Sequence, residues 1–349
     1  MTEAGQEDTI LIWGAGAIGG ILGAYWARAG HPVLLVDIDA AHVAACNETG
    51  LHIEGPVEEF IQAVPAATPD QVKGTFRRVV LAVKAQATEA AMKMLLPHLA
   101  DDGYILSAQN GLNEHLIAEL AGPQRTMGAF VNYGSDWQGP GRILFGNRGA
   151  VVVGEIDGSI RDRTREMFDL LKVFEPDAVL TENIWSYLWG KLGYGAQLFA
   201  TALTPDSMSA NFADPDRVPV LIELGREVMK VAKAENIPPR GFNGFDPAAY
   251  SDTAGDAEAR ASIAALAAFT SKTAKTHSGI WRDLAVRKRR TEVDPQIGII
   301  VTIAAKHGLD VPVLARLVEL IHEIEDGKRP QSKDTFMELD KVLRGTAAA

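Results

Sequence analysis

The sequence is poor in three things: cysteine, net positive charge and long apolar runs. Its single cysteine, Cys46, excludes an internal disulfide and a zinc site built on cysteines, and we expect no metal site. The formal net charge of −11 argues against the basic face that a nucleic-acid or anionic-membrane binder needs. The closest approach to a membrane span, residues 184–203, carries Lys191, Gln197 and three glycines and is too polar to cross a bilayer.

The amino terminus also lacks the marks of an export signal. Its first eight residues, Met-Thr-Glu-Ala-Gly-Gln-Glu-Asp, are acidic and polar, whereas a secretory signal peptide has a basic start and an apolar centre. We therefore expect a cytoplasmic protein with a small-molecule ligand, and no nucleic-acid or membrane partner. Any anionic ligand must find local cations.

Length and pattern indicate two domains. At 349 residues the chain exceeds one ordinary hydrophobic core. The first half alternates short β-rich runs with helical segments, whereas the pattern after Glu182 is helical throughout. We therefore predict an α/β domain over residues 8–182 and an all-helical domain over 183–345, with no flexible linker between them.

The expected elements follow the same patterns. Strands are predicted at 9–13, 33–36, 61–64, 79–83, 104–107, 128–133, 143–145 and 150–154, and the last three suit antiparallel strands that close the sheet. Helices are predicted at 87–99, 161–173, 184–202, 215–235, 256–275, 279–307 and 312–326. The segment 237–256, rich in Pro, Gly, Asp and Asn, is either a lid or a solvated surface loop.

A glycine-rich turn joins the first apolar run to a helical pattern. The turn consists of Gly14, Ala15, Gly16, Ala17, Ile18 and Gly19. An acid, Asp37, follows the second apolar run, eighteen residues after Gly19. This order of elements, in which a G-x-G-x-x-G turn joins a strand to a helix and an acid follows the next strand, is typical of a dinucleotide-binding unit. The glycine-rich turn alone is weaker evidence, because many such turns bind no ligand.

Each part of this pattern has a physical task. The first glycine permits the tight turn, the second lets backbone N–H groups approach a pyrophosphate, and the third lets the helix pack on the strand. The helix N-terminus presents its positive dipole end to the phosphates. Asp37 can accept hydrogen bonds from ribose hydroxyls and would repel a 2′-phosphate, so we expect NAD(H) rather than NADP(H).

Lys191 is the only charged residue between Glu182 and Asp206. It lies in a segment that is apolar nearly all round, which is typical of a buried helix. A buried ammonium is costly unless it is paired or hydrogen-bonded. Lys191 is therefore a structural ion-pair member, a side chain that reaches the surface, or a catalytic group with a lowered pKa.

Polar residues at the ends of two predicted strands favour the catalytic interpretation of Lys191. The predicted strand at 79–83 is followed by Lys84, and the next one, at 104–107, by Gln109, Asn110 and Gly111. Polar residues at the carboxyl ends of parallel strands line the crevice where ligands bind. A later polar segment contains Arg-Thr-Glu-Val-Asp at 290–294.

Taken in order, these motifs resemble the ketopantoate reductase (2-dehydropantoate 2-reductase) family. The resemblance runs from about residue 9 to 345 and rests on the glycine-rich turn, the Val-Lys-Ala at Lys84, Gln-Asn-Gly at Asn110, Trp-Gly-Lys-Leu at Lys191 and the segment 290–294. It implies an α/β Rossmann domain followed by an all-α domain of the 6-phosphogluconate dehydrogenase C-terminal type. It also implies an active site between the two domains and a homodimer.

The resemblance assigns roles to individual residues. Lys191 matches the catalytic lysine, which would protonate and stabilise the alkoxide when hydride reaches a 2-oxo carbon. Asn110 matches an asparagine near the nicotinamide and the reacting oxygen. Glu292 matches an acid that contacts cofactor and substrate, and Lys84 a residue near the cofactor. The plain alternatives are a turn former for Asn110 and solvated charges for Glu292 and Lys84.

Two positions on the lysine helix depart from the family pattern. Where the family has substrate-binding asparagines four and eight residues after the lysine, this chain has Gly195 and Phe199. Neither can supply the amide hydrogen bonds that hold a small hydroxylated 2-oxo acid. An unpaired buried polar group costs about 1–3 kcal/mol, so these residues indicate a bulkier or less polar substrate.

The later segment departs as well. The family's Ser-Ser-Met-x-x-Asp stands here as Ser278-Gly-Ile-Trp281-Arg-Asp283. Ser278 and Trp281 are candidate substrate-binding residues, and Trp281 is alternatively part of a helix-packing core. The basic residues at 282 and 287–290 either draw an anion toward the site or form a solvated helix face.

Asp37 is a third departure, because many ketopantoate reductases use NADPH and have a small residue followed by arginine here. Our hypothesis is an NAD(H)-preferring oxidoreductase that interconverts a hydroxy acid, or a related alcohol, and its oxo form. The alternatives are an NADPH-dependent 2-dehydropantoate 2-reductase of pantothenate biosynthesis and a catalytically silent cofactor-binding regulatory protein. The substrate, the physiological direction and the oligomeric state do not follow from the sequence.

Overall fold

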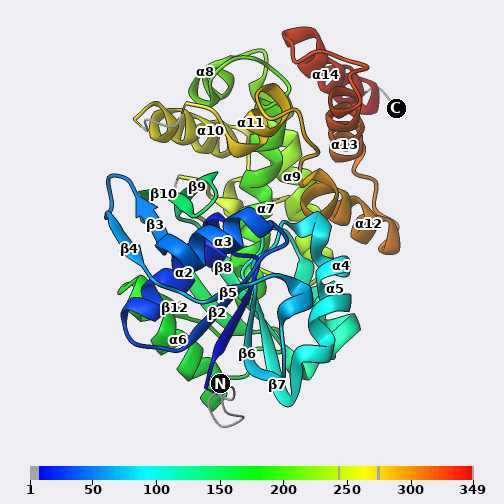
Figure 1. Cartoon of the computed structure of the whole chain (residues 1–349). Coiled ribbons are helices and arrows are strands. Elements are labelled where there is room, and N and C mark those ends of the chain that lie inside the picture. Colours follow the sequence, from blue (N-terminus) through cyan, green and yellow to red (C-terminus); the bar gives the residue numbers. More distant parts are fainter. Residues whose placement is uncertain (1–7, 243, 273–275, 348–349) are drawn as a thin grey trace. The chain divides into compact units, whose positions relative to one another are not determined.

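The computed structural model of the chain (Figure 1) describes residues 8–242, 244–272 and 276–347. Contacts divide the chain into two compact units, Met1–Ile184 and Trp185–Ala349, which we call the first and second unit. Most of the acidic amino-terminal stretch and residues 273–275, the end of the helix predicted at 256–275, lie outside the described residues.

The first unit is built on an eight-stranded sheet in the order β12-β11-β8-β7-β6-β1-β2-β5. Its strands are β1 (Ile10–Trp13), β2 (Val33–Val36), β5 (Ala66–Ala67), β6 (Phe76–Leu81), β7 (Leu99–Ser107), β8 (Thr126–Val131), β11 (Val151–Glu155) and β12 (Val179–Leu180). The strands from β5 across to β8 run parallel, whereas β11 is antiparallel to β8. With β2 and β6 on opposite sides of β1, this is the doubly wound arrangement of a Rossmann domain.

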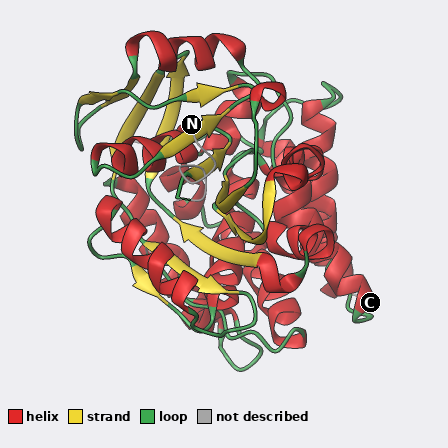
Figure 2. Cartoon of the chain, turned by 60° about the horizontal axis from the view of Figure 1, so that its bottom comes forward, coloured by secondary structure: helices red, strands yellow, loops and turns green. Residues whose placement is uncertain are grey.

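Helices cover both faces of this sheet, and Figure 2 shows the strands between them. The helices are α2 (Ala17–Arg28), α3 (Ala40–Thr49), α4 (Thr88–Leu95), α5 (Asn113–Ala121) and α6 (Asp162–Phe174). Alternate residues of β1 enter different cores: Ile10 and Ile12 pack with α2 and α6, and Leu11 and Trp13 with α4 and α5. A strand that is buried on both faces needs an unbroken apolar run, which β1 has.

A second, four-stranded sheet in the first unit corrects one prediction. Its order is β4 (Phe60–Gln62), β3 (Leu51–Glu54), β10 (Arg142–Asn147) and β9 (Gly134–Gly139). The predicted strand at 143–145 belongs to this sheet and not to the closing edge of the main sheet. Ile143 and Phe145 pack against α2, because an apolar run demands burial but does not specify which strand it pairs with.

The predicted helix at 87–99 is shorter than expected. It ends at Leu95, is followed by a 3-10 turn at Leu96–His98, and Leu99 already belongs to β7. Pro97 lies in that turn and has no N–H to continue an α-helical ladder. Further 3-10 turns occupy Pro69–Gln71, Ala85–Ala87 and Pro123–Arg125.

The described part of the second unit contains helices and no named strand, as the sequence predicted. Its elements are α7 (Ile184–Thr201), α8 (Met208–Ala213), α9 (Val218–Ala234), the 3-10 turn η5 (Pro247–Tyr250), α10 (Asp256–Ser271), α11 (Gly279–Ala285), the π-helix η6 (Asp294–Gly298), α12 (Ile299–Lys306), α13 (Pro312–Glu325) and α14 (Lys333–Ala347). The short α8 and the terminal α14 were not predicted. Among the described residues, no helix is long and apolar enough to cross a membrane.

The helix predicted at 279–307 is broken. It ends at Ala285 and resumes only with η6 and α12, and between them Lys288 adopts a positive φ of 49°. The N–H of Arg289 folds back on the carbonyl of Asp283, which turns the chain. Pro295, within η6, is the one local sign of the interruption.

The segment 237–256 packs against α7 instead of extending into solvent. Phe245 and Tyr250 are 2% and 1% exposed, and their rings stack 5.1 Å apart. The N–H of Arg240 donates to the carbonyl of Ser186 on α7 at 2.8 Å. Two large aromatic side chains therefore anchor this segment in the core of the second unit, while others, among them Asp246 and Asp252, are exposed, and the choice between a lid and a surface loop stays a prediction.

Candidate active site

Four of the predicted cofactor positions follow neighbouring strands of the main sheet. Gly14 follows β1, Asp37 follows β2, Lys84 lies three residues after β6, and Asn110 lies three residues after β7. These strands are parallel, so their carboxyl ends meet at one edge, and the chain reverses its winding direction at β1. The Lys84 side chain is exposed there and that of Asn110 is half-buried.

The glycine-rich turn is shaped by close backbone contacts. Gly14 has φ +104°, and a Cβ there would lie 2.6 Å from the backbone nitrogen of Val83. A Cβ at Gly19 would lie 2.1 Å from the carbonyl oxygen of Gly14, so neither position tolerates a side chain. Ala15 is buried beneath the turn, and Ala17 and Ile18 are half-buried against the α2 core.

Gly16 differs from the other two glycines in facing open space. A Cβ added to Gly16 would meet no heavy atom within 4 Å. Gly16 is also the N-cap of α2 and offers the first turn of that helix no side-chain hydrogen bond. An open glycine at the uncapped amino end of a 12-residue helix fits a bound diphosphate, which accepts from backbone N–H groups and interacts with the helix dipole.

Asp37 is tied to this turn by hydrogen bonds. Its Oδ2 accepts from the N–H of Ala15 at 3.0 Å, and its Oδ1 accepts from the N–H of Asp39 at 3.0 Å. A carboxylate offers about four lone-pair positions, so acceptor capacity remains on both oxygens. The half-buried carboxylate is thus fixed beside the glycine-rich turn, with Ile38 79% exposed next to it.

His42 holds the same turn from the other side, and the sequence analysis missed it. Its Nδ1 accepts from the N–H of Gly141 at 2.9 Å, so the proton of the neutral ring is on Nε2, which donates to the carbonyl of Ala15 at 2.9 Å. The ring is 1% exposed. Asp37 and His42 therefore hold the N–H and the C=O of Ala15, a pairing across 27 residues that no spacing rule indicates.

The loop that carries Asn110 is fixed by a buried chain of side chains. The Nε2 of Gln109 donates to the Thr88 hydroxyl at 2.8 Å, and that oxygen lies 3.0 Å from Oδ1 of Asn113. The Nδ2 of Asn113 in turn donates to the backbone carbonyl of Asn110 at 2.6 Å. This series of hydrogen bonds links the segment after β6 to the segment after β7, so it fixes the backbone that carries Asn110.

In the second unit, Lys191 lies in the middle of α7. The helix buries Leu188, Trp189 and Leu192 around it, and the lysine side chain is half-buried. Nearby on the same helix, burial raises the pKa of Tyr194 to about 12, which keeps that phenol neutral. The predicted apolar surroundings of Lys191 are thus present within this unit.

The two departures on α7 differ in their surroundings. Gly195 lies one helical turn after Lys191 on the same face, and a Cβ there has one neighbour within 4 Å, Oε1 of Gln296 at 3.9 Å. Phe199, one turn further, is fully buried. Both positions are buried, but Gly195 leaves room for a Cβ, whereas the Phe199 ring is part of the core.

Glu292 is positioned by the end of α13. It is 8% exposed, and its neighbour Thr291 donates from both its N–H and its hydroxyl to Oε1 of Glu325, at 2.7 and 2.8 Å. Glu325 is itself paired with Arg290 at 2.9 Å. Glu325 is a second residue that the sequence analysis missed, because it stands 33 residues after Glu292 in a helix with no recognisable motif.

Ser278 and Trp281 lie at the start of α11. The Ser278 hydroxyl caps the helix by accepting from the N–H of Trp281 at 3.1 Å. The indole Nε1 of Trp281 donates to the carbonyl of Thr204 at 3.1 Å, and its ring lies 4.1 Å from that of His277. Both candidate substrate residues therefore have structural contacts, and their contact with substrate stays a prediction.

The three arginines after α11, at 287, 289 and 290, are paired with acids. Arg287 and Arg289 both contact Oδ1 of Asp283, at 3.1 and 2.9 Å, and Arg290 pairs with the end of α13. The residues at 287–290 lie on an exposed loop, so the helix-face alternative is wrong for them, whereas Arg282 lies on α11. The local pairing also reduces the field that these cations can project toward an anion.

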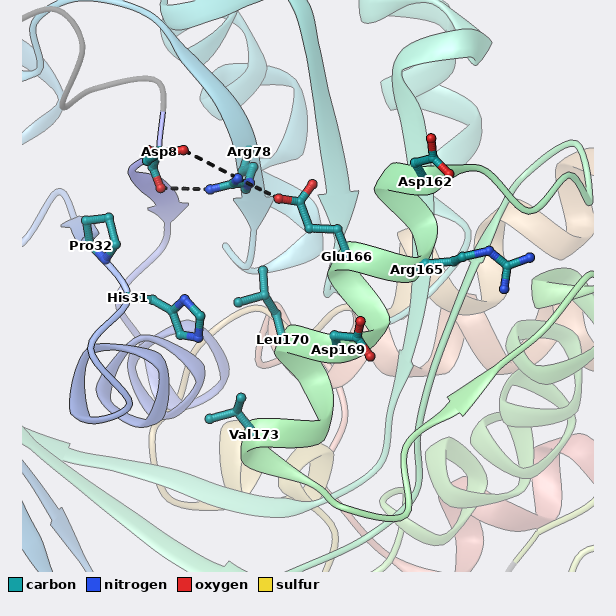
Figure 3. Close-up of a pocket in the computed structure, with 10 residues that line it drawn as sticks. All are labelled: Asp8, His31, Pro32, Arg78, Asp162, Arg165, Glu166, Asp169, Leu170 and Val173. Carbon is teal, nitrogen blue, oxygen red and sulfur yellow. Dashed lines mark hydrogen bonds and ion pairs between the residues drawn. The ribbon is translucent and has the colours of Figure 1, made fainter.

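A cavity of about 820 Å³ opens at the opposite edge of the main sheet (Figure 3). It is lined by the starts of β1, β2 and β6 and by α6. Arg78 is paired there with Glu166 at 2.5 Å and lies 3.7 Å from Asp8. This cavity contains none of the predicted site residues and lies at the amino ends of strands, where doubly wound sheets do not place their ligands.

Comparison with known proteins gives matches over both units. The family described as ketopantoate reductase PanE/ApbA matches residues 10–158, and the family described as its C-terminal domain matches residues 183–325. A 2-dehydropantoate 2-reductase from Archaeoglobus fulgidus is 27% identical over 325 residues, which cover 92% of this chain and 99% of that enzyme. One from Pyrococcus abyssi is 33% identical over 188 residues, which cover 52% of this chain and 59% of that enzyme.

Solved structures share the fold along most of the chain. A PanE/ApbA family ketopantoate reductase from Ralstonia eutropha has a TM-score of 0.76 at 26% identity, covering 91% of this chain and 99% of that chain. A ternary complex of D-mandelate dehydrogenase with NADH and anilino(oxo)acetate has a TM-score of 0.79 at 22% identity, covering 91% and 98%. The chain belongs to the ketopantoate reductase family and is an oxidoreductase that acts on CH–OH groups with a nicotinamide cofactor.

Proposed function

We propose that this chain is an NAD(H)-preferring oxidoreductase that interconverts a hydroxy acid and its 2-oxo acid, with a substrate other than ketopantoate. The observation that carries the proposal is the Asp37 carboxylate, held against the glycine-rich turn by the N–H of Ala15. Its neighbour is the exposed Ile38, and not the arginine that would neutralise a 2′-phosphate.

In this proposal the first unit holds the dinucleotide. The glycine-rich turn and the α2 N-terminus receive the diphosphate, Asp37 accepts from the ribose hydroxyls, and Lys84 and Asn110 lie at the nicotinamide side of the sheet edge. The cofactor supplies hydride exchange with the substrate carbon when bound. The residues of the chain do the rest: they hold the substrate and move its proton.

Lys191 is the proposed general acid and base. In reduction its ammonium donates a proton to the oxygen that becomes a hydroxyl, and in oxidation the neutral amine accepts that proton. Lys191 is half-buried, and apolar side chains of the same helix, among them Leu188, Trp189 and Leu192, lie around it. Asn110 and Glu292 assist by hydrogen bonding to the reacting oxygen and to cofactor and substrate.

The substrate is proposed to differ from ketopantoate because of α7. Gly195 and Phe199 carry no amide where the family pattern has two, and Phe199 is buried in the core. Ser278 and Trp281 are proposed to complete the substrate side. The homodimer implied by the resemblance belongs to the same proposal, and light scattering in solution measures it.

Steady-state kinetics test the proposed function. The purified chain is assayed with ketopantoate and with a panel of 2-oxo acids that carry aliphatic or aromatic side chains, each with NADH and with NADPH. We expect kcat/KM with NADH to exceed that with NADPH, and at least one 2-oxo acid to exceed ketopantoate. Efficient NADPH-linked reduction of ketopantoate contradicts the proposal, and NADH binding without turnover of any acid favours the catalytically silent alternative.

A further inference from the structure

Gly195 is buried, but it leaves room for a Cβ beside a polar side chain from another element. Apart from the backbone of α7 itself, a Cβ at Gly195 would have Oε1 of Gln296 as its one neighbour within 4 Å, at 3.9 Å. This space lies on the α7 face that also carries Lys191, one helical turn or about 5.4 Å along the axis. Both residues belong to the second unit, so this geometry does not depend on the first.

Gln296 lies on a segment whose position is well fixed. It belongs to the π-helix η6, and such single-turn distortions of a helix are frequent at functional sites. The N–H of Gln296 donates to the carbonyl of Glu292 at 3.2 Å. Asp294, in the same π-helix, lies 3.1 Å from Nε2 of His322 on α13. The backbone that carries the amide is thus held from two sides.

The side chain of Gln296 differs from other glutamines of this unit. Gln197 donates to the carbonyl of Leu221 at 3.0 Å, and Gln331 to that of Ala202 at 2.8 Å. Within the described parts of the chain, the amide of Gln296 makes no such hydrogen bond. It is half-buried, so it presents an uncommitted donor and acceptor to the space beside Gly195.

We propose that Gln296 is a specificity-determining residue of the active site: its amide hydrogen-bonds to a carboxylate or hydroxyl oxygen of the substrate in the space beside Gly195. The proposal rests on the proposed function, since it takes Lys191 as the group at the reacting oxygen. It refines that function, because Gln296 would supply a polar contact to the substrate that Gly195 and Phe199 on α7 cannot supply.

The chemistry of the amide limits the ligand. A glutamine has no charge, so it recognises oxygen by hydrogen bonding and does not select anions by charge. Its N–H₂ can donate to a carboxylate, and its C=O can accept from a hydroxyl, with a flip of the amide between the two.

The test compares two substrates that differ by one hydroxyl. The acids are 3,3-dimethyl-2-oxobutanoate and its 4-hydroxy derivative, ketopantoate, and both are assayed together with the best acid of the panel. Gln296→Met keeps the length of the side chain and removes its donor and acceptor. Gln331→Met is the matched control, a half-buried glutamine of the same unit that is used in a backbone contact. Thermal unfolding and NADH fluorescence titration report the folding and cofactor binding of each variant.

We expect Gln296→Met to raise KM for the best acid about 10- to 100-fold, the loss of one buried hydrogen bond, with a smaller change in kcat. A rise confined to ketopantoate means that the amide contacts the hydroxyl, and an equal rise for both acids means that it contacts the carboxylate. Gln331→Met is expected to leave KM within about twofold.

The opposing outcomes separate two failures. If the wild-type chain reduces an acid and Gln296→Met leaves every KM unchanged, the inference is wrong and the proposed function stands. If the wild-type chain reduces none of the acids, the proposed function is wrong and the inference is wrong with it. An equal loss in both glutamine variants, together with a lowered melting temperature, assigns Gln296 a structural role and also overturns the inference.

Discussion

Asp37→Asn changes the preference between NADH and NADPH with almost no change of shape. Asparagine keeps one acceptor oxygen, so one of the two backbone hydrogen bonds, from Ala15 or Asp39, is retained. The charge is lost completely. The variant therefore removes the charge of the carboxylate together with part of its hydrogen bonding, and both effects enter the expected change in cofactor choice.

The magnitude follows from two terms. A unit charge about 5 Å from a 2′-phosphate is repelled by about 3 kcal/mol at an effective dielectric constant near 20. Screening by solvent at this half-exposed edge lowers the repulsion to about 1–2 kcal/mol. Removing the charge should therefore raise kcat/KM with NADPH about 5- to 30-fold. Loss of a charge-assisted hydrogen bond to the ribose of NADH costs about 1.5 kcal/mol or more, at least tenfold.

The assay is the ratio of kcat/KM with NADH to kcat/KM with NADPH, measured with one acid at saturation. We expect Asp37→Asn to lower this ratio about a hundredfold, from the two terms together. Asp39→Asn is the control, because Asp39 caps α3 through Ala41 and His42 and asparagine caps equally well. An unchanged ratio in a folded Asp37→Asn protein refutes the assignment of Asp37 to the ribose.

Three further variants test the supporting structure. Burial raises the pKa of Glu227 to about 7, so the folded protein keeps a proton that the unfolded chain releases above about pH 4.5. The free energy of unfolding of the wild-type protein should therefore fall by about 3 kcal/mol as pH rises from about 4.5 to 7. Urea unfolding at several pH values should show this fall in the wild-type protein and not in Glu227→Gln. Glu325→Gln weakens its hold on Thr291 and so displaces Glu292, the proposed contact to cofactor and substrate; kcat should fall about tenfold and NADH binding should weaken, measured by steady-state kinetics and fluorescence titration. Gly19→Ala places a Cβ against the Gly14 carbonyl and should lower stability by about 2 kcal/mol or more and weaken NADH binding, measured by thermal unfolding and fluorescence titration.

The sequence predicts best what local rules decide. The glycine-rich turn is predicted correctly because Gly14 and Gly19 are required by contacts within a few residues and with the neighbouring strand. The strand at 143–145 is assigned to the wrong sheet because pairing depends on distant residues. The break after Ala285 is not predicted because ion pairs to Asp283 stabilise a turn in a helix-compatible sequence, in which Lys288 adopts an unfavourable positive φ.

The residues of the candidate site also differ in whether a local pattern predicts them. Asp37 is predicted from its distance from the glycines, and Lys191 from its isolation in an apolar helix, and both roles stay predictions. His42 and Gln296 are not predicted, because each contacts a part of the fold that is distant in sequence: His42 contacts Ala15, and Gln296 lies beside Gly195. A polar residue whose contact partner is distant along the chain cannot be recognised from a local motif in one sequence.

The central claim is that Lys191 moves the proton of the substrate hydroxyl, and Lys191→Ala tests it most directly. Turnover of the best acid and NADH binding are measured on the same preparations, with Lys233→Ala, which breaks an exposed pair with Asp252, as the control. We predict that Lys191→Ala lowers kcat by about 10²- to 10⁴-fold and leaves the Kd for NADH within about twofold. A kcat equal to that of the control variant contradicts the account.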